Sequence, residues 1–298
     1  MLSVQTNNAS LIAQNSVNKT NDLLSNAMER LSTGLRINSA ADDAAGLQIA
    51  TRLNANVTGM ETASRNVSDA TSMLQTADGA LEEITTIANR QKELATQANN
   101  GVNSGKDLAA LDAEFQQLTA EMTRILEETT YAGNNLFDAL ANTTTFQIGA
   151  SSSETLDVTV AQTNLAAITA SDANGATATV DLTALRLTDA SVDADYTGDT
   201  IVTQGAGAGG AMNAVDALID VVGEARSTLG ANINRLGHTA SNLANVTENT
   251  KAAAGRIMDT DFAVETGNMT KNQLLVQAGT NILSSANQNT GLVMGLLG

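Results

Sequence analysis

Few side chains in this sequence could do chemistry, and their spacing argues against a catalytic or metal site. His238 is the single histidine, so a multi-histidine site is excluded, and a His-Glu-x-x-His zinc motif is missing. Cysteine is absent, which removes thiol nucleophiles, thiolate metal sites and disulfides. We therefore interpret His238 as an ordinary helix-surface residue, and expect no enzyme activity, no cofactor and no bound metal.

Adjacent carboxylates are the other candidates for acid–base or cation chemistry. They occur as Asp42/Asp43, Glu82/Glu83 and Glu127/Glu128. Neighbouring residues on a helix point in different directions, so such pairs rarely converge on one ligand. Helix capping and solvation explain them better. The glycine-rich run 205–210 lacks the Lys-Ser/Thr of a phosphate loop, and we interpret it as a flexible joint.

The composition narrows the classes of partner. The chain has 298 residues, with 32 acidic and 15 basic side chains and a formal net charge of -17. This acidic balance disfavours nucleic acid and anionic membranes as partners. Apolar runs are too short for a transmembrane helix, and the first residues do not predict a secretory signal peptide. Proline is absent, which suits long uninterrupted helices.

The elements that must position any site are helices with a heptad pattern. Between 53 and 98, apolar residues recur every seven positions, with a second column three residues further on that is interrupted by Gln91. This sustained seam predicts one long helix packed against partners. Ser39 and Asp42, just before it, are spaced like a capping box. The first column is Leu53, Met60, Val67, Leu74, Leu81, Ala88 and Ala95.

A turn-rich break over 99–105 separates this helix from a second one, which ends before 131. Its apolar residues, spaced three and four apart, are Leu108, Leu111, Phe115, Leu118, Met122 and Ile125. The two helices are expected to form a helical hairpin. From about 140 to 205, alternating β-branched residues predict short strands or hairpins.

Heptads return after 210, so the two ends of the chain mirror each other. One column keeps a seven-residue spacing that only Thr250 interrupts: Val215, Val222, Leu229, Leu236, Leu243 and Ile257. An offset column comprises Leu218, Ala225, Val246 and Ala253. The economical arrangement packs the long helices in one antiparallel bundle. Each terminal segment has a narrow apolar stripe that needs a partner, which another copy could supply. We expect a folded middle, about 45–255, and mobile ends that become ordered on assembly.

Two long motifs carry a family resemblance. The segment 30–47, RLSTGLRINSAADDAAGL, closely resembles the N-terminal signature of bacterial flagellins. The segment 256–266, RIMDTDFAVET, with QAGTNIL at 277–283 and ANQ at 286–288, resembles their C-terminal signature. The similarity covers roughly 1–140 and 210–298.

The resemblance implies a mainly α fold: long heptad helices in an antiparallel bundle, terminal helices that form a coiled coil on assembly, and a small β-hairpin insert. It implies segments 1–42 and 256–298 in the filament core, helical halves 43–140 and 209–255, and a variable surface region 141–208. The function implied is a subunit of the extracellular flagellar filament, exported unfolded by the type III apparatus. The implied polymerisation seam is Val17, Leu24, Met28, Leu31, Leu35, Phe262, Met269, Val276 and Leu283.

The resemblance also implies partners. Beyond self-association these are a flagellar export chaperone, the filament cap and hook–filament junction proteins. The segment 89–97, NRQKELATQ, is similar to the part of flagellins read by the innate receptor TLR5. The implied contact residues are Arg90, Leu94, Gln97 and Glu114, although solvated helix positions would show the same residue types.

Three alternatives stay open at this point. The nearest is the hook–filament junction protein of the same apparatus, which shares the end motifs of flagellin. An autonomous coiled-coil bundle would explain the heptads without a polymer, but would not need the matching polar–apolar ends. An adhesin or hydrolase built on a flagellin frame would need a larger insert with a catalytic set.

Overall fold

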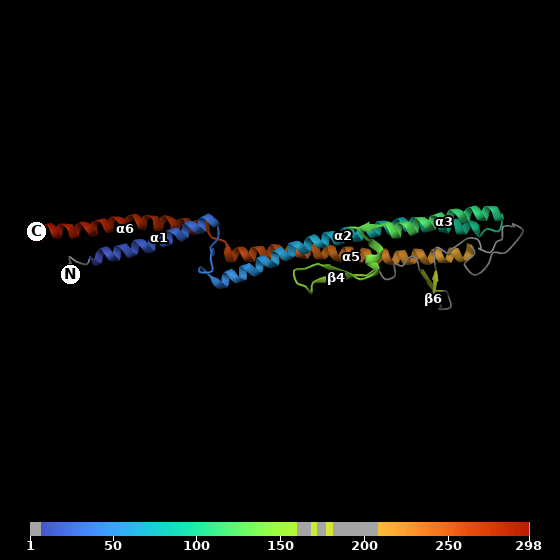
Figure 1. The fold of residues 1–298 in the computed structure, drawn as a ribbon, viewed down its shortest axis with the longest axis horizontal. Helices are drawn as coiled ribbons and strands as arrows, with labels where there is room; N and C mark the ends of the chain where they lie inside the picture. Colours follow the sequence, from blue (N-terminus) through green and yellow to red (C-terminus); the bar gives the residue numbers. More distant parts are fainter. Residues whose placement is uncertain (1–6, 160–167, 172–176, 181–207, 298) are drawn as a thin grey trace. The chain divides into compact units, whose positions relative to one another are not determined.

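The computed structural model describes residues 7–159, 168–171, 177–180 and 208–297. The chain divides into two compact units. Unit 1 comprises residues 1–58 and 247–298, and unit 2 comprises residues 59–246. Each unit is formed by segments that are far apart in the sequence or folded back as hairpins (Figure 1).

Unit 1 is built on two antiparallel helices, α1 (Asn8–Thr33) and α6 (Phe262–Leu297), which lie side by side (Figure 1). At one end Asn7 Nδ2 donates a hydrogen bond to the carbonyl of Ala286 at 3.0 Å. At the other end Leu35 and Asp259 form an antiparallel β-bridge. The narrow apolar stripe of α1 therefore has its partner within the same chain.

A short joint connects these helices to the long ones. Gly34 ends α1 with φ of 75°, in the left-handed region that glycine adopts without steric cost. Arg36 N then donates to Met258 O at 2.6 Å, and Arg36 Nη2 donates to Ile257 O at 2.9 Å. Ile37 of the joint is only 1% exposed, and its Cδ1 would lie 2.8 Å from a Cβ atom built on Gly46.

The helix that follows is capped by a residue other than the one expected. Asp43 Oδ1 accepts a hydrogen bond from Gly46 N at 2.9 Å, so Asp43 caps α2 (Ala44–Ala98). The predicted capping box of Ser39 and Asp42 is wrong, because Asp42 closes a separate turn over 38–42 instead. The two adjacent aspartates of the motif therefore have different structural roles: Asp42 closes the turn and Asp43 caps α2.

Unit 2 contains most of α2, with α3 (Gly105–Glu128) and the first part of α5 (Ala208–Met258) against it. Gln91 of α2 bonds to α3, and Lys92 pairs with Asp216 of α5 at 2.5 Å. Arg226 of α5 reaches back to Asp78 of α2 at 2.8 Å. These contacts define the expected helical hairpin and an antiparallel pairing of α2 with α5.

The predicted heptads form the core of unit 2. In α2 every first-column residue from Met60 to Ala95 is buried, and so is Gln91, which interrupts the second column. In α5 the first column is buried from Val215 to Leu243, whereas Val246 is 42% exposed. Within unit 2 the seam therefore predicted burial well except at Val246, whereas Leu53 and Ile257, which belong to unit 1, are only half-buried. Helix α5 also begins at Ala208, so 208–210 are helical and are not part of a flexible joint.

Local capping explains the break between α2 and α3 and the turn after α3. Ser104 and Asp107 form a complete capping box at the start of α3. Strands β1 (Thr130–Tyr131) and β2 (Asn134–Asn135) enclose a two-residue turn in which Ala132 and Gly133 both have positive φ, 50° and 84°. Asn135 then caps α4 (Leu136–Ala141) and donates to the last carbonyls of α3.

The expected small β region is confirmed as two separate hairpins. Strand β3 (Thr144–Gln147) pairs with β4 (Thr155–Val158), and β5 (Ile168–Ser171) pairs with β6 (Thr177–Val180), both antiparallel. Asn66 Nδ2 donates to Gln147 O at 3.2 Å and so fastens the first hairpin to α2. Residues 160–167, 172–176 and 181–207 of the predicted insert lie outside the described residues.

Candidate polymerisation surface

The α1–α6 pair is held by a seam of mainly small or half-buried residues. Ala13 and Ala27 of α1 are buried, and Glu265 of α6 is 8% exposed. Gly279 permits close approach, since a Cβ atom there would lie 2.5 Å from Cγ2 of Val17. The pair is therefore tightly packed along a narrow line, and most of its circumference faces outward.

The structure places the nine predicted seam residues in two groups. Met28 and Phe262 are 49% and 57% exposed. The other seven are half-buried: Val17, Leu24, Leu31, Leu35, Met269, Val276 and Leu283. The seam thus first serves to pair the two ends of one chain, and its incomplete burial leaves part of each side chain accessible.

A set of exposed apolar residues lies beside this seam, and we call it the lateral face. Its members are Ile12 and Leu23 of α1, with Val264, Leu275 and Ile282 of α6. Leu23, Leu275 and Ile282 each stand one position before a predicted seam residue. Ile12 and Val264 stand one position before Ala13 and Glu265, which are buried between the two helices. They therefore lie to the same side of the seam on their helices, because each residue advances the helix by roughly 100°.

Antiparallel pairing brings both halves of the lateral face together. Two antiparallel helices are related by a twofold axis perpendicular to their plane, so positions equally offset from the seam share one face of the pair. Asn7 bonds to Ala286 and Gly279 meets Val17, which sets Ile12 near the level of Ile282 and Leu23 near that of Leu275. Antiparallel pairing thus places the five apolar residues of the lateral face, from α1 and α6, on one side of the helix pair.

Seam-centred reasoning from the sequence missed the lateral face. Its residues lie outside the predicted seam, because a seven-residue repeat read along one line of a helix ignores the positions on either side of that line. The available signal was that large apolar residues directly precede seam positions on both terminal helices. A soluble chain seldom gathers such residues on one face without a partner for them.

The joint beside this surface depends on the carboxylate of Asp42. Its Oδ2 accepts hydrogen bonds from Ser39 N at 2.9 Å, Asn38 N at 3.1 Å and Ser39 Oγ at 3.0 Å. These donors, led by the backbone amide of Ser39, hold the pKa of Asp42 below its ordinary value. Arg30, whose Nη2 lies 3.9 Å from Oδ1, acts in the same direction.

In unit 2, the residues of the receptor hypothesis fall into one region of α2 and α3. Arg90 donates to Glu114 Oε1 from Nη2 at 2.8 Å and to Glu93 Oε2 from Nη1 at 2.9 Å. These bonds, with the Glu114 bond the larger cause, raise the pKa of Arg90. Gln97 is exposed nearby, whereas Leu94 is only 1% exposed and belongs to the core.

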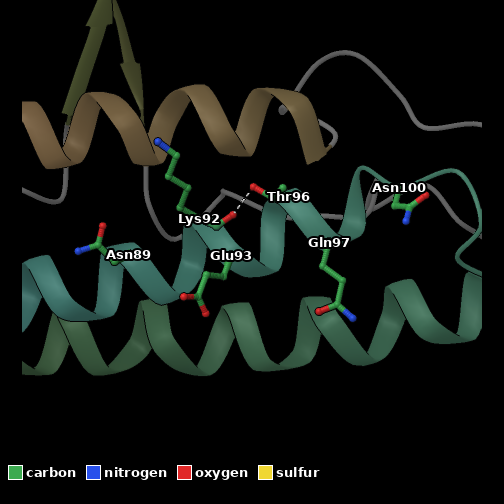
Figure 2. A pocket seen from close by; sticks show the side chains of 6 residues that line it. All are labelled: Asn89, Lys92, Glu93, Thr96, Gln97 and Asn100. Atoms are coloured by element: carbon green, nitrogen blue, oxygen red, sulfur yellow. Dashed lines mark hydrogen bonds between the residues drawn. The ribbon is translucent and has the colours of Figure 1, made fainter.

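A shallow open depression of about 740 Å³ lies over the same stretch of α2 (Figure 2). In Figure 2, Lys92 extends toward α5, and Glu93 and Gln97 extend toward α3. The lining is polar and mixed in charge, which suits a macromolecular contact better than a small ligand. The six lining residues are Asn89, Lys92, Glu93, Thr96, Gln97 and Asn100.

The adjacent carboxylates have separate surroundings. Glu82 reaches Arg226 at 3.5 Å, and Glu128 reaches Arg124 at 2.8 Å, while Asp42 and Asp43 serve the joint and the α2 cap. Within the described ranges, no group of three or more His, Asp or Glu side chains is placed to hold a metal ion. His238 is exposed on α5. None of the helices described is both long and apolar enough to cross a membrane.

Comparison with known proteins assigns both ends of the chain. Residues 4–142 match the family described as the bacterial flagellin N-terminal helical region, and residues 212–297 match the bacterial flagellin C-terminal helical region. A flagellin of Halalkalibacterium halodurans is 41% identical over 271 residues, which is 91% of this chain and 90% of the relative. Flagellin A of Vibrio anguillarum is 36% identical, covering 99% of both chains. The crystal structure of Bacillus cereus flagellin matches 60% of this chain and 88% of its own, with 27% identity and a TM-score of 0.43.

Proposed function

Because the chain belongs to the bacterial flagellin family, we propose that its α1–α6 pair makes the contacts that build the polymer, with the lateral face as the principal surface. The chain is a structural subunit of the flagellar filament and is located there, outside the cell. Both matching family regions and the named relatives are flagellins, so the hook–filament junction alternative gains no support.

The observation that carries this proposal is the exposure of the lateral face. Val264 is 59% exposed and Ile282 is 60% exposed, which leaves large apolar side chains in water. Full burial of such a side chain from water contributes about 1.5–3 kcal/mol, so covering the part that is still exposed contributes roughly 1–2 kcal/mol. Several such side chains along two helices therefore favour association of each subunit with another copy.

The half-buried seam complements this surface. Leu24, Leu31, Met269 and the other seam residues pair the two ends of one chain, and neighbouring copies would cover what remains exposed, including Met28 and Phe262. On this proposal segments 1–42 and 256–298 form the filament core. Segments 43–140 and 209–255 are the two halves of the helical domain, and 141–208 is the surface region.

Substitution of Leu275 tests the proposal. Leu275→Asp places a charge on the lateral face, whereas Gln273→Asp adds the same charge to α6 away from both seam and face. We expect purified Leu275→Asp monomer to melt like the wild type but fail to extend short filament seeds, as measured by sedimentation and electron microscopy. Gln273→Asp should extend the seeds normally. Normal growth of Leu275→Asp filaments would remove the lateral face from the subunit contact.

We extend the proposal to the contacts made during export, at the filament cap and at the hook–filament junction, although no particular residues are assigned to them. Family membership supports export through the flagellar type III apparatus with a chaperone, and contact with the filament cap and hook–filament junction proteins. We also propose that the chain acts as a structural protein without catalysis. Pull-down of each purified accessory protein with monomer, and with filament ends, would test these partners individually.

Recognition by TLR5 is a second proposal, supported by the segment 89–97 and by its geometry. Arg90, Glu114 and Gln97 are exposed on neighbouring helices, so one macromolecular partner can contact all three. Leu94 is buried, and its part in the proposal is to hold α2 in place rather than to touch the receptor.

A receptor reporter assay with purified monomer tests this second proposal. Arg90→Ala should lower activation strongly. Arg124→Ala, which removes an exposed arginine that is also paired with two glutamates, should leave activation unchanged. Equal activation by both variants would exclude Arg90 as a contact, and a silent wild-type monomer would exclude recognition. Filament assembly of Arg90→Ala should be measured in parallel.

A further inference from the structure

Helix α3 buries a stripe that is not its most apolar one. The buried residues are Asp112, Phe115, Thr119 and Met122. Leu111, Leu118 and Ile125 are only half-buried, although the apolar pattern predicts them in the contact. At 3.6 residues per turn, the buried stripe is rotated by roughly 50° from the centre of the apolar stripe.

Hydrophobic burial alone does not explain this rotation. Turning α3 toward Leu118 would bury more apolar area and would release Thr119 to solvent. A polar interaction that is lost on turning must therefore hold the helix where it is. The side chain of Gln91 supplies that interaction from α2.

Gln91 is completely buried, and both of its hydrogen bonds reach α3. Its Nε2 donates to Thr119 Oγ1 at 2.8 Å and to the carbonyl of Phe115 at 3.3 Å. Thr119 Oγ1 donates in turn to the same carbonyl at 3.0 Å. A carbonyl can only accept, so the amide cannot be reversed without losing that bond.

The hydrogen bonds of Gln91 leave one of its own atoms unsatisfied, which lowers the stability of the core. Among the described residues, Gln91 Oε1 is a fully buried side-chain atom without a hydrogen-bond partner. An unsatisfied buried acceptor destabilises a core, whereas an apolar residue at this heptad position would not. Elsewhere in unit 2, the buried side-chain amide of Asn232 makes its hydrogen bonds within α5. Its Nδ2 donates to Thr228 O, and its Oδ1 accepts from Arg235. Gln91 therefore differs from Asn232 in linking two helices.

We propose that Gln91 is a positioning residue that fixes the rotation of α3 about its own axis against α2. The Gln91–Thr119–Phe115 contact selects the observed stripe over the more apolar alternative. The same rotation keeps Glu114 beside Arg90, so the buried amide also determines which charged side chains the hairpin presents at its surface. Buried polar groups select one packing in other helical assemblies by the same physics.

Cysteine labelling measures the rotation directly, because the chain contains no cysteine of its own. Leu118→Cys and Gln116→Cys would report from opposite sides of the buried stripe. In a Gln91→Leu background, we expect maleimide labelling to become several-fold slower at position 118 and several-fold faster at position 116. A general loosening of the helix would speed both, so opposite changes identify rotation.

Two further backgrounds keep the test decisive. Thr119→Val preserves shape but removes the hydroxyl, and it should shift both labelling rates in the same directions as Gln91→Leu. Asn232→Leu removes a buried amide that does not touch α3, and it should change neither rate. Unchanged labelling in both Gln91→Leu and Thr119→Val, with folding verified by circular dichroism, would overturn the proposal. If Gln91→Leu does not fold, the comparison of Thr119→Val with Asn232→Leu decides it.

Discussion

Cγ2 of Val17 occupies the space that a side chain on Gly279 would need: a Cβ atom built on Gly279 would lie only 2.5 Å away. This contact between α1 and α6 joins residues from opposite ends of the sequence. It sets how closely the two terminal helices approach, and therefore how the lateral face is assembled from both.

The first prediction concerns this contact. Gly279→Ala should weaken the α1–α6 pair by about 1–3 kcal/mol through overpacking, even though alanine favours helices by about 1 kcal/mol. Gly267→Ala, on the same helix with open space around it, should have the opposite sign. Combining Gly279→Ala with Val17→Ala should restore the pair. Hydrogen exchange of the α1 amides, followed by seeded polymerisation, measures both effects, and no rescue by Val17→Ala would refute the steric explanation.

A second prediction concerns the first β-hairpin of unit 2. A Cβ atom on Gly59 would approach Cβ of Ala150 to 2.9 Å and its Cα to 3.3 Å. Gly59→Ala should therefore displace the β3–β4 hairpin from α2, at a cost of about 1–3 kcal/mol. Gly79 lies in the same helix, and a Cβ atom built there would have no neighbouring atom within 4 Å, so Gly79→Ala should stabilise α2 slightly. Faster hydrogen exchange in residues 144–158 for Gly59→Ala alone is the expected result, and equal exchange in both variants would contradict it.

The third prediction is a pH dependence of the joint. Hydrogen bonds to the Asp42 carboxylate lower its pKa in the folded chain, so the folded state binds a proton less readily than the unfolded state. The stabilisation is therefore fully present above the unfolded pKa, about 3.9, and is lost as pH falls through the folded pKa.

Asp42→Asn should remove this dependence and loosen the turn over 38–42 already at neutral pH. Amide signals of Ser39 and Asn38, followed by NMR from pH 6 downward, would report it. Asp22→Asn, an exposed change on α1, is the control and should retain the wild-type response. A wild-type turn that stays intact through full protonation of Asp42 would show that the carboxylate charge is not needed.

The fourth prediction compares a buried and an exposed heptad residue. Leu81 is fully buried in α2, whereas Val246 in α5 is 42% exposed. Leu81→Ala should lower the free energy of unfolding by about 2–5 kcal/mol because of the cavity it leaves. Val246→Ala should change it by less than about 0.5 kcal/mol. Denaturant titration of both monomers gives the comparison, and similar losses would mean that Val246 is buried in solution.

Heptad spacing predicted the long helices because a seam sustained over many turns admits few other structures. Within unit 2 the columns of α2 and the first column of α5 were identified correctly from residues alone, including the polar interruption at Gln91, whereas Val246 of the offset column is exposed. The β-hairpins were indicated by alternation over short runs. The two end motifs pointed to the flagellin family before any contact was known.

The sequence could not identify which surfaces meet. An apolar stripe states that a helix needs a partner, but not which one, so α1 was expected to await another copy although α6 of the same chain covers part of it. The predicted helix cap by Ser39 and Asp42 was wrong, and Asp43 caps α2 instead, because capping depends on backbone geometry within a residue or two.

The rotation of α3 also separates what the sequence predicts from what the tertiary structure decides. By itself, the sequence determined the helices, their apolar columns and the family. Only the tertiary structure showed that Thr119 is buried in preference to Leu118, because that choice depends on a hydrogen bond from Gln91, 28 residues away. Periodicity is a local property of the chain, whereas the pairing of two buried polar groups exists only once the helices have met.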